Sequence, residues 1–251
     1  MRLAIHLVRG DTRIGLCATP KHPAYSQRSL RGADTLNTRF VWLCVCLGLI
    51  VPAPLLAGEA QPLRDKTLVA WVTPANLEQR GGSVLTIEKP GGVFDAIVFG
   101  ELAPARWMAG SNLFQRTDRN QNDVAAETAG QDTLVQMAIV YRGREITIYR
   151  NGSEYSRYTV KQPETFGTDS HVLMGLRHLD AAPANRYWTG SIDDARIYDR
   201  ALTAEQIRAL VPNQPSDPQP IAWWDFERGS TSDRAGRFAV TTLIGHARID
   251  A

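Results

Sequence analysis

Cysteine is scarce in this chain, which limits how its fold can be held together. Of 251 residues only Cys17, Cys44 and Cys46 are cysteines, and all three lie in or before a strongly apolar segment near residue 50. A domain built from the residues that follow can form no disulfide, so its stability must come from its own hydrophobic core. The same part of the chain has no thiol nucleophile and no cysteine that could carry a lipid.

The usual catalytic signatures are also missing. The sequence has no G-x-S-x-G elbow, no glycine-rich phosphate loop, no H-E-x-x-H, and no E-x-D-x-x-E run that would place glycosidase carboxylates on one strand. Glu88, Asp95 and Glu101 fall on separate segments, where we expect solvated or turn-capping acids. His171 and His178 are seven residues apart and would face opposite sides of one strand, which predicts a structural and a surface role, respectively, rather than a shared metal. The sequence favours a non-enzyme, with glycoside hydrolase as the alternative activity.

Strong charge of one sign is absent as well. The formal net charge is +2 and 22% of the residues are charged, which is ordinary for a globular protein. We therefore expect no nucleic-acid partner.

Residues 41–57 form the one long apolar run. Its uninterrupted part before Pro52 is shorter than the roughly 20 residues of a membrane-spanning helix, and small residues follow it at Ala57, Gly58 and Ala60. The pattern predicts a signal peptide over 38–58, hence a secreted, periplasmic or cell-surface protein with no stable membrane insertion of the mature chain; a retained anchor is the alternative. Residues 1–37 are expected to be an unstructured extension, either a genuine leader or the product of a start codon placed too far upstream.

Beyond the apolar run, short β segments alternate with turn residues. Segments 67–72, 84–88 and 93–99 each end at a glycine or proline, and residues 135–160 predict a β-meander whose Asn151-Gly152 dipeptide suits a type I′ turn. Residues 115–132 are the most polar stretch and predict a surface loop, solvated or ligand-facing.

The stretch from Gly190 to Ile207, GSIDDARIYDRALTAEQI, joins a predicted strand to a short helix near residues 203–211. Side chains alternate with period 2 from Ile192 to Tyr198. Thr203 stands at an N-cap position with Gln206 three residues later, as in a capping box.

Both this stretch and the meander QMAIVYRGREITIYRNGSEY resemble laminin-G-like domains with the concanavalin A-like jelly roll, loosely over residues 66–211. The resemblance implies an all-β fold with two antiparallel sheets over 61–211. It also implies a structural calcium ion held by an acid on the closing strand, Asp193 by its position, with Asp194 as the alternative; the competing interpretation is that both acids cap turns or pair with Arg196 and Arg200.

Residues 212–220 are a proline-rich linker, after which AWWDFE resembles the opening strand of a laminin-G-like module. Residues 221–251 then either complete the first jelly roll or begin a second, truncated module. An incomplete jelly roll would expose unpaired strand edges, which favours completion. Module, linker and tail together are similar to the accessory regions of exported family 32 glycoside hydrolases, without the catalytic propeller.

Ligand-binding residues are expected where aromatic and polar side chains are neighbours in the sequence, because sugars are held by ring stacking and fixed hydrogen bonds. The candidates are Arg106, Trp107, Arg177, His178 and Trp188, with core packing as the alternative for each tryptophan. Trp71, Trp223 and Phe226 are expected in the core.

These observations predict an exported, non-catalytic jelly-roll module that binds polysaccharide or another extracellular glycan or protein. The alternatives are an accessory fragment of a fructan-type glycoside hydrolase and a structural adhesion or spacer domain.

Overall fold

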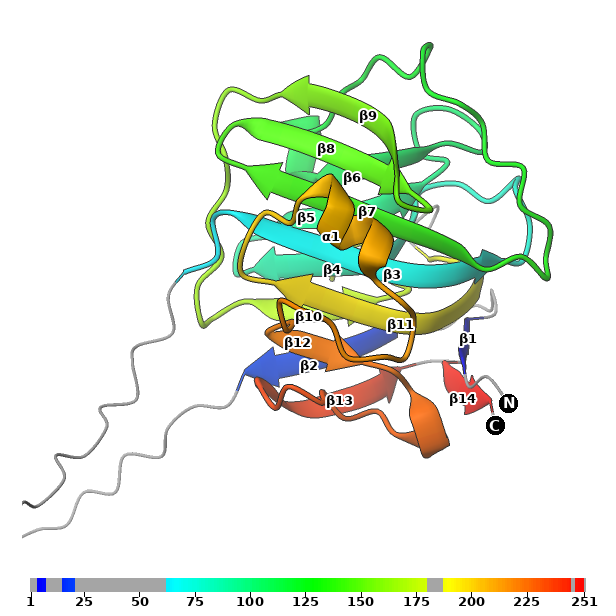
Figure 1. Ribbon diagram of the computed structural model, residues 1–251, viewed down its shortest axis with the longest axis vertical. Helices are drawn as coiled ribbons and strands as arrows, with labels where there is room; N and C mark the ends of the chain where they lie inside the picture. Colours follow the sequence, from blue (N-terminus) through cyan, green and yellow to red (C-terminus); the bar gives the residue numbers. More distant parts are fainter. Residues whose placement is uncertain (1–3, 8–14, 21–61, 180–186, 245–246, 251) are drawn as a thin grey trace, which may run out of the picture. The chain divides into compact units, whose positions relative to one another are not determined.

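The computed structural model describes residues 4–7, 15–20, 62–179, 187–244 and 247–250 (Figure 1). The predicted signal peptide at 38–58 and most of the predicted N-terminal extension lie outside the described residues.

The described chain folds into two antiparallel β-sheets that pack as a sandwich, which confirms the predicted fold class (Figure 1). The eight-stranded sheet has the order β14-β1-β11-β3-β7-β8-β9, with β12 also paired to β11. Its strands are β1 (Ala4–Leu7), β3 (Lys66–Pro74), β7 (Val135–Arg142), β8 (Glu145–Arg150), β9 (Ser153–Thr159), β11 (Gly190–Tyr198), β12 (Ala222–Trp224) and β14 (Arg248–Asp250).

The six-stranded sheet has the order β13-β2-β10-β4-β5-β6. Its strands are β2 (Gly15–Pro20), β4 (Gly82–Lys89), β5 (Val93–Phe99), β6 (Trp107–Ser111), β10 (His171–Met174) and β13 (Phe238–Ile244). The expected strands at 67–72, 84–88 and 93–99 are thus present as β3, β4 and β5.

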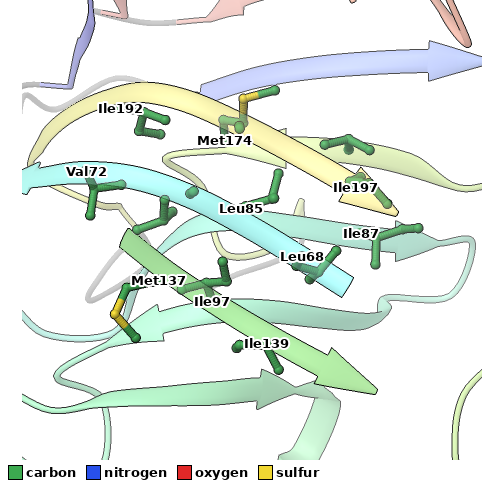
Figure 2. Packing of buried hydrophobic residues seen from close by; sticks show 14 of the residues in the cluster. Leu68, Val72, Leu85, Ile87, Ile97, Met137, Ile139, Met174, Ile192 and Ile197 are labelled. Carbon is green, nitrogen blue, oxygen red and sulfur yellow. The ribbon is translucent and has the colours of Figure 1, made fainter. Parts of the chain in front are cut away.

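The main core lies between the two sheets. Strand alternation sends Leu68 and Val72 of β3 inward, where they meet Leu85, Ile87 and Ile97 of the other sheet (Figure 2). These side chains are at most 2% exposed, and each fully buried aliphatic side chain contributes roughly 1.5–3 kcal/mol. This interior can hold the domain together without disulfides.

The opposite face of β3 and β7 is covered by the α-helix α1 (Ala204–Ala209) and the segment before it. Val69 and Trp71 on the sheet pack in one cluster with Leu202, Ile207 and Leu210. The helix begins with the predicted capping box, in which the Thr203 side chain accepts from the Gln206 N–H and the Gln206 side chain accepts from the Thr203 N–H. The helix prediction is confirmed.

The strand at Gly190–Tyr198 departs from strict alternation. Its pairing with β3 shifts register between Ile192 and Asp194, which makes Asp193 the extra residue of a β-bulge. Ile192 and Ala195 therefore both face the core, although residues three positions apart in a regular strand would face opposite sides. In the predicted meander, the β8–β9 pairing also shifts register between Ile148 and Tyr149. At the turn that follows, Asn151 and Gly152 take φ values of 48° and 75°, as a type I′ turn requires.

Residues near both ends of the described chain add strands to the sheets. β12 pairs with β11, β13 with β2, and β14 with β1, while Trp224, Phe226 and Phe238 enter the main core; a short 3-10 helix (Glu227–Gly229) lies between β12 and β13. The expectation of an unstructured extension is wrong for residues 4–7 and 15–20. They pair with β11 and β10, whose backbone groups would otherwise lie at open sheet edges.

Candidate functional site

A pocket of about 440 Å³ lies over the outer face of the six-stranded sheet. Its walls come from the β4–β5 turn, the ends of β5 and β6, a single 3-10 turn (Asn112–Phe114), and the residues after β10. Strand alternation explains the position of Phe94 in this lining: because Ile97 and Phe99 point into the core, Phe94, Ala96 and Val98 point to the outer face, where they form a small cluster with Met108. The pocket brings together two of the expected ligand-binding residues, Arg177 and His178.

Polar groups in the pocket are held by defined partners. The His178 ring stacks on Phe94, with ring centroids 4.9 Å apart and planes 16° from parallel. The Arg177 guanidinium forms an ion pair with Glu101, a residue whose role in the pocket was not predicted. Burial raises the pKa of the Glu101 carboxyl above its usual value, and Arg177 opposes this rise by favouring the charged form. One small cavity thus presents an aromatic surface, a carboxylate, a guanidinium and an imidazole.

The rim of the pocket has a strained backbone. Leu113 and Phe114 have φ values of 52° and 55°, in the left-handed region that costs a residue with a side chain roughly 1–2 kcal/mol. Leu113 is also 80% exposed, the most exposed large apolar residue among those described. Strain of this kind is concentrated at functional sites, where the surrounding structure maintains it.

A second hollow, a groove of about 990 Å³, lies next to the pocket along the chain. It is lined by residues 115–118 on one side and 158–164 on the other. The Tyr158 hydroxyl donates to the Arg116 carbonyl oxygen at 3.0 Å and so joins the two sides.

A buried ion cluster supports both hollows. Asp95 accepts from Arg116 Nε at 2.8 Å and lies 2.8 Å from Lys66 Nζ, and all three side chains are at most 4% exposed. Burial lowers the pKa of Lys66, and the charge of Asp95 opposes that change. Asp95 is therefore a buried structural acid, and the expectation that it is solvated or turn-capping was wrong. Glu88 is likewise buried, 3.2 Å from His171 Nε2.

The structure places Trp107 and Trp188 away from any ligand surface. Both side chains are 0% exposed and their rings pack 5.5 Å apart in the main core, so neither ring has a face available for stacking. Arg106 is not part of the pocket lining; its Nε donates to the Val124 carbonyl oxygen at 2.7 Å. Core packing, the alternative for the tryptophans, describes them, as it does Trp71 and Trp223 at 4% and 6% exposure.

Hydrogen bonds to the Glu127 carboxylate hold the polar segment 115–132 against the sandwich. Its carboxylate accepts from Trp107 Nε1, from Nε and Nη2 of Arg150, and from the backbone N–H groups of Thr128 and Ala129. Burial would raise the pKa of Glu127, but these donors outweigh it and lower the pKa to about 2. The segment is a loop as predicted, held against the sandwich by a buried carboxylate.

Asp193, the expected metal ligand, is 2% exposed and accepts from Asn213 Nδ2 at 3.2 Å. The same nitrogen is 3.3 Å from Glu227 Oε1, while Asn213 Oδ1 is buried and has no hydrogen-bond partner among the described residues. Its neighbour Asp194 forms a buried pair with Arg196, as the competing interpretation stated. Among the described residues, no group of three or more His, Cys, Asp or Glu side chains is arranged to hold a metal.

Comparisons with known proteins agree with this architecture. The family described as the concanavalin A-like lectin/glucanases superfamily matches residues 53–208. A SAP-like pentraxin from Limulus polyphemus has a TM-score of 0.50 at 12% identity, with 82% of this chain and 80% of the pentraxin covered.

A predicted carbohydrate binding protein from Bacteroides ovatus has a TM-score of 0.56 at 12% identity, with 100% of this chain and 60% of that protein covered. The extracellular region of zebrafish Gpr126/Adgrg6 has a TM-score of 0.52 at 12% identity, with coverages of 74% and 24%. These likenesses concern the fold alone. A search of curated protein sequences found no match, and none of the helices in the described residues has the length and apolarity needed to cross a membrane.

Proposed function

Because the chain belongs to the concanavalin A-like lectin/glucanases superfamily, we propose that it is an exported, non-catalytic module that binds glycan in the pocket around Arg177 and His178. The observation that carries this proposal is the composition of the pocket. Apolar surface from Leu113 and Phe114, and the His178 ring stacked on the buried Phe94, lie beside the ion pair of Arg177 and Glu101.

This combination suits a sugar for chemical reasons. The C–H face of a pyranose or furanose ring packs on apolar and aromatic side chains, while its hydroxyls need both donors and acceptors in fixed positions. Arg177 supplies donors only, and ionised Glu101 supplies acceptors only. Their pairing holds both groups in place before a ligand arrives, which reduces the entropy lost on binding.

The number of carboxylates in the pocket lining supports a binding function rather than hydrolysis. Most glycosidases place two carboxylates on either side of the scissile bond, roughly 5–9.5 Å apart. Glu101 is the one carboxylate among the described residues that line this pocket. A fructan-type hydrolase activity would therefore need a second acid from outside the described lining.

A glycan array probed with the full chain tests the proposal, with fructans and plant and algal polysaccharides among the ligands. Arg177→Met removes the guanidinium but keeps much of the side-chain volume, and should weaken binding at least tenfold, or about 1.4 kcal/mol. Arg200→Met is the matched control, since Arg200 is exposed and its side chain pairs, among the described residues, with its neighbour Asp199. A wild-type chain that binds no glycan would leave the spacer or protein-binding alternatives in its place.

We also propose a structural calcium ion at Asp193. Asparagine oxygen and nitrogen are assigned from their hydrogen bonds, and a 180° rotation of the Asn213 amide would turn its unpartnered Oδ1 toward the carboxylates of Asp193 and Glu227. Two carboxylates and an amide oxygen are hard ligands of the kind calcium takes. Calcium would there neutralise the buried Asp193 and the half-buried Glu227, and fix the bulge of β11.

The melting temperature with calcium and with EDTA tests this site. Calcium should raise it in the wild type and in the control Asp199→Asn, but not in Asp193→Asn. A wild-type melting temperature that does not respond to calcium would remove the ion from the proposal.

Export is proposed from the signal-like run at 38–58. Cleavage after this run would remove β1 and β2, the strands that β14 and β13 pair with. The intact mass of the protein recovered from its native compartment decides whether these strands are retained, and recovery from the cytoplasm alone would contradict export.

A further inference from the structure

The pocket and the groove are separated by very little structure. Residues Ser111 to Phe114 line the pocket, and the next four residues, Gln115 to Asp118, line the groove. We infer that the two hollows form one extended site for a linear, uncharged oligosaccharide; this inference rests on the proposed function.

One side chain connects the two hollows internally. Arg116 lines the groove, yet its Nη2 donates to the Phe94 carbonyl oxygen at 2.8 Å and to Asn112 Oδ1 at 2.9 Å, and both of those residues line the pocket. Because Arg116 is 4% exposed and fixed to Asp95, the two hollows are held at a constant spacing. A ligand that spans both meets a preorganised surface.

The pocket wall nearest the groove carries an apolar side chain that extends into solvent. Leu113 belongs to the turn from which the chain passes from the pocket to the groove, and it is 80% exposed with φ 52°. A leucine this exposed in a left-handed conformation costs conformational energy and buries little apolar area within the chain. A sugar ring laid across the turn would cover it with its apolar face.

The groove offers polar groups that the protein does not use itself. The side chains of Gln115, Lys161 and Gln162 are exposed and make no hydrogen bond or ion pair within the part of the chain that the structure describes. Amides both donate and accept, and the lysine ammonium donates three hydrogen bonds, which suits a ligand rich in hydroxyls.

The charges in the groove select against a strongly charged ligand. Arg116 and Lys161 are cations, while Asp118 and Glu164 are anions, so the formal charges of the lining balance. A polyanionic glycan would be attracted by the two cations and repelled by the two anions. The groove therefore fits neutral sugars better than sulfated or uronic ones.

Isothermal titration calorimetry with the full chain tests this inference. The probes are neutral fructo-, xylo- and cello-oligosaccharides, each from disaccharide to hexasaccharide. For the wild type we expect affinity to increase at least tenfold with length in the series that binds, as the ligand passes from the pocket over Leu113 into the groove.

Three variants divide the site. Lys161→Ala/Gln162→Ala should leave disaccharide affinity unchanged and abolish the increase with length. Leu113→Asn, which tolerates the left-handed backbone, should reduce hexasaccharide affinity several-fold without reducing the melting temperature. Arg177→Met should weaken all lengths by a similar factor, and Arg200→Met none.

The outcomes separate the two proposals. Oligosaccharides that bind with the same affinity at every length, or a Lys161→Ala/Gln162→Ala variant that keeps the length dependence, would overturn the extended site and leave the pocket as a glycan site. Failure of every oligosaccharide and polysaccharide to bind the wild type would overturn both.

Discussion

Replacing Glu127 by glutamine tests how the loop that forms one side of the groove is held. The carboxylate accepts five hydrogen bonds at 2.6–2.9 Å, from Trp107, Arg150 and two backbone N–H groups. Glutamine has almost the same shape but loses the charge, and it turns an N–H₂ group toward donors that need an acceptor. The change therefore removes the anchor without creating a cavity.

Its magnitude follows from the carboxyl pKa. A pKa of about 2, compared with the ordinary 4.5, means that folding favours the ionised form by roughly 3 kcal/mol. Arg150, the main charged partner, has a side chain that is 30% exposed, so solvent screens part of this energy. We expect Glu127→Gln to lower the free energy of unfolding at neutral pH by about 2 kcal/mol.

The pH dependence distinguishes this cause from ordinary loss of packing. A carboxyl whose pKa is depressed in the folded state stabilises the protein above its unfolded pKa of 4.5, and this stabilisation is lost as the pH falls toward 2. The difference between wild type and Glu127→Gln should therefore shrink over that range.

Urea denaturation, followed by tryptophan fluorescence at neutral and acidic pH, measures both quantities. Glu154→Gln is the control, because the pair of Glu154 and Arg157 is exposed on β9 and solvent screens it, so its loss should leave the free energy of unfolding nearly unchanged. If Glu127→Gln and wild type differ by the same amount at every pH, the charge of Glu127 is not what anchors the loop.

Three further substitutions probe the framework by the same urea assay. Asp95→Asn leaves the buried cations Lys66 and Arg116 without their shared carboxylate and should cost about 3–5 kcal/mol. This loss of stability should diminish as the pH rises toward 10.5. Burial already lowers the pKa of Lys66, and a neutral Lys66 needs no buried carboxylate as a partner. A loss that is independent of pH would contradict this cause. Thr203→Ala removes the capping box and should cost about 1 kcal/mol, and an unchanged midpoint would mean that α1 does not depend on its cap. Gly190→Ala would place Cβ 2.3 Å from the backbone carbonyl oxygen of Thr73 and should therefore be destabilising. Wild-type stability in this variant would show that the end of the strand can shift.

The parts of the fold that were predictable are those with local signals. The turn at Asn151-Gly152 and the cap at Thr203 each depend on a few consecutive residues, and both formed as expected. The pairing of β1 with β11 and β14 was not predictable, because sequence patterns identify strands but carry no information on which distant edge a short strand joins.

The candidate site was predictable only in part. Residue type indicated Arg177 and His178, and both line the pocket. The same argument failed for Trp107 because its indole faces the core, and adjacency to Arg106 does not tell which face of β6 a residue occupies. Glu101 was missed because its partner is 76 positions away in the chain.

The two outer faces of the sandwich explain why the pocket lies where it does. On the eight-stranded sheet, α1 covers one part, and the Arg196 guanidinium fills another between the rings of Trp71 and Trp223, 4.9 and 4.8 Å from their centroids. On the six-stranded sheet, the outward residues of β5 and β6 are covered by Leu102 of a loop and Phe114 of the short 3-10 turn rather than by an α-helix. Loops can change in length and sequence without disturbing the core, so this face can acquire a binding site at low cost in stability.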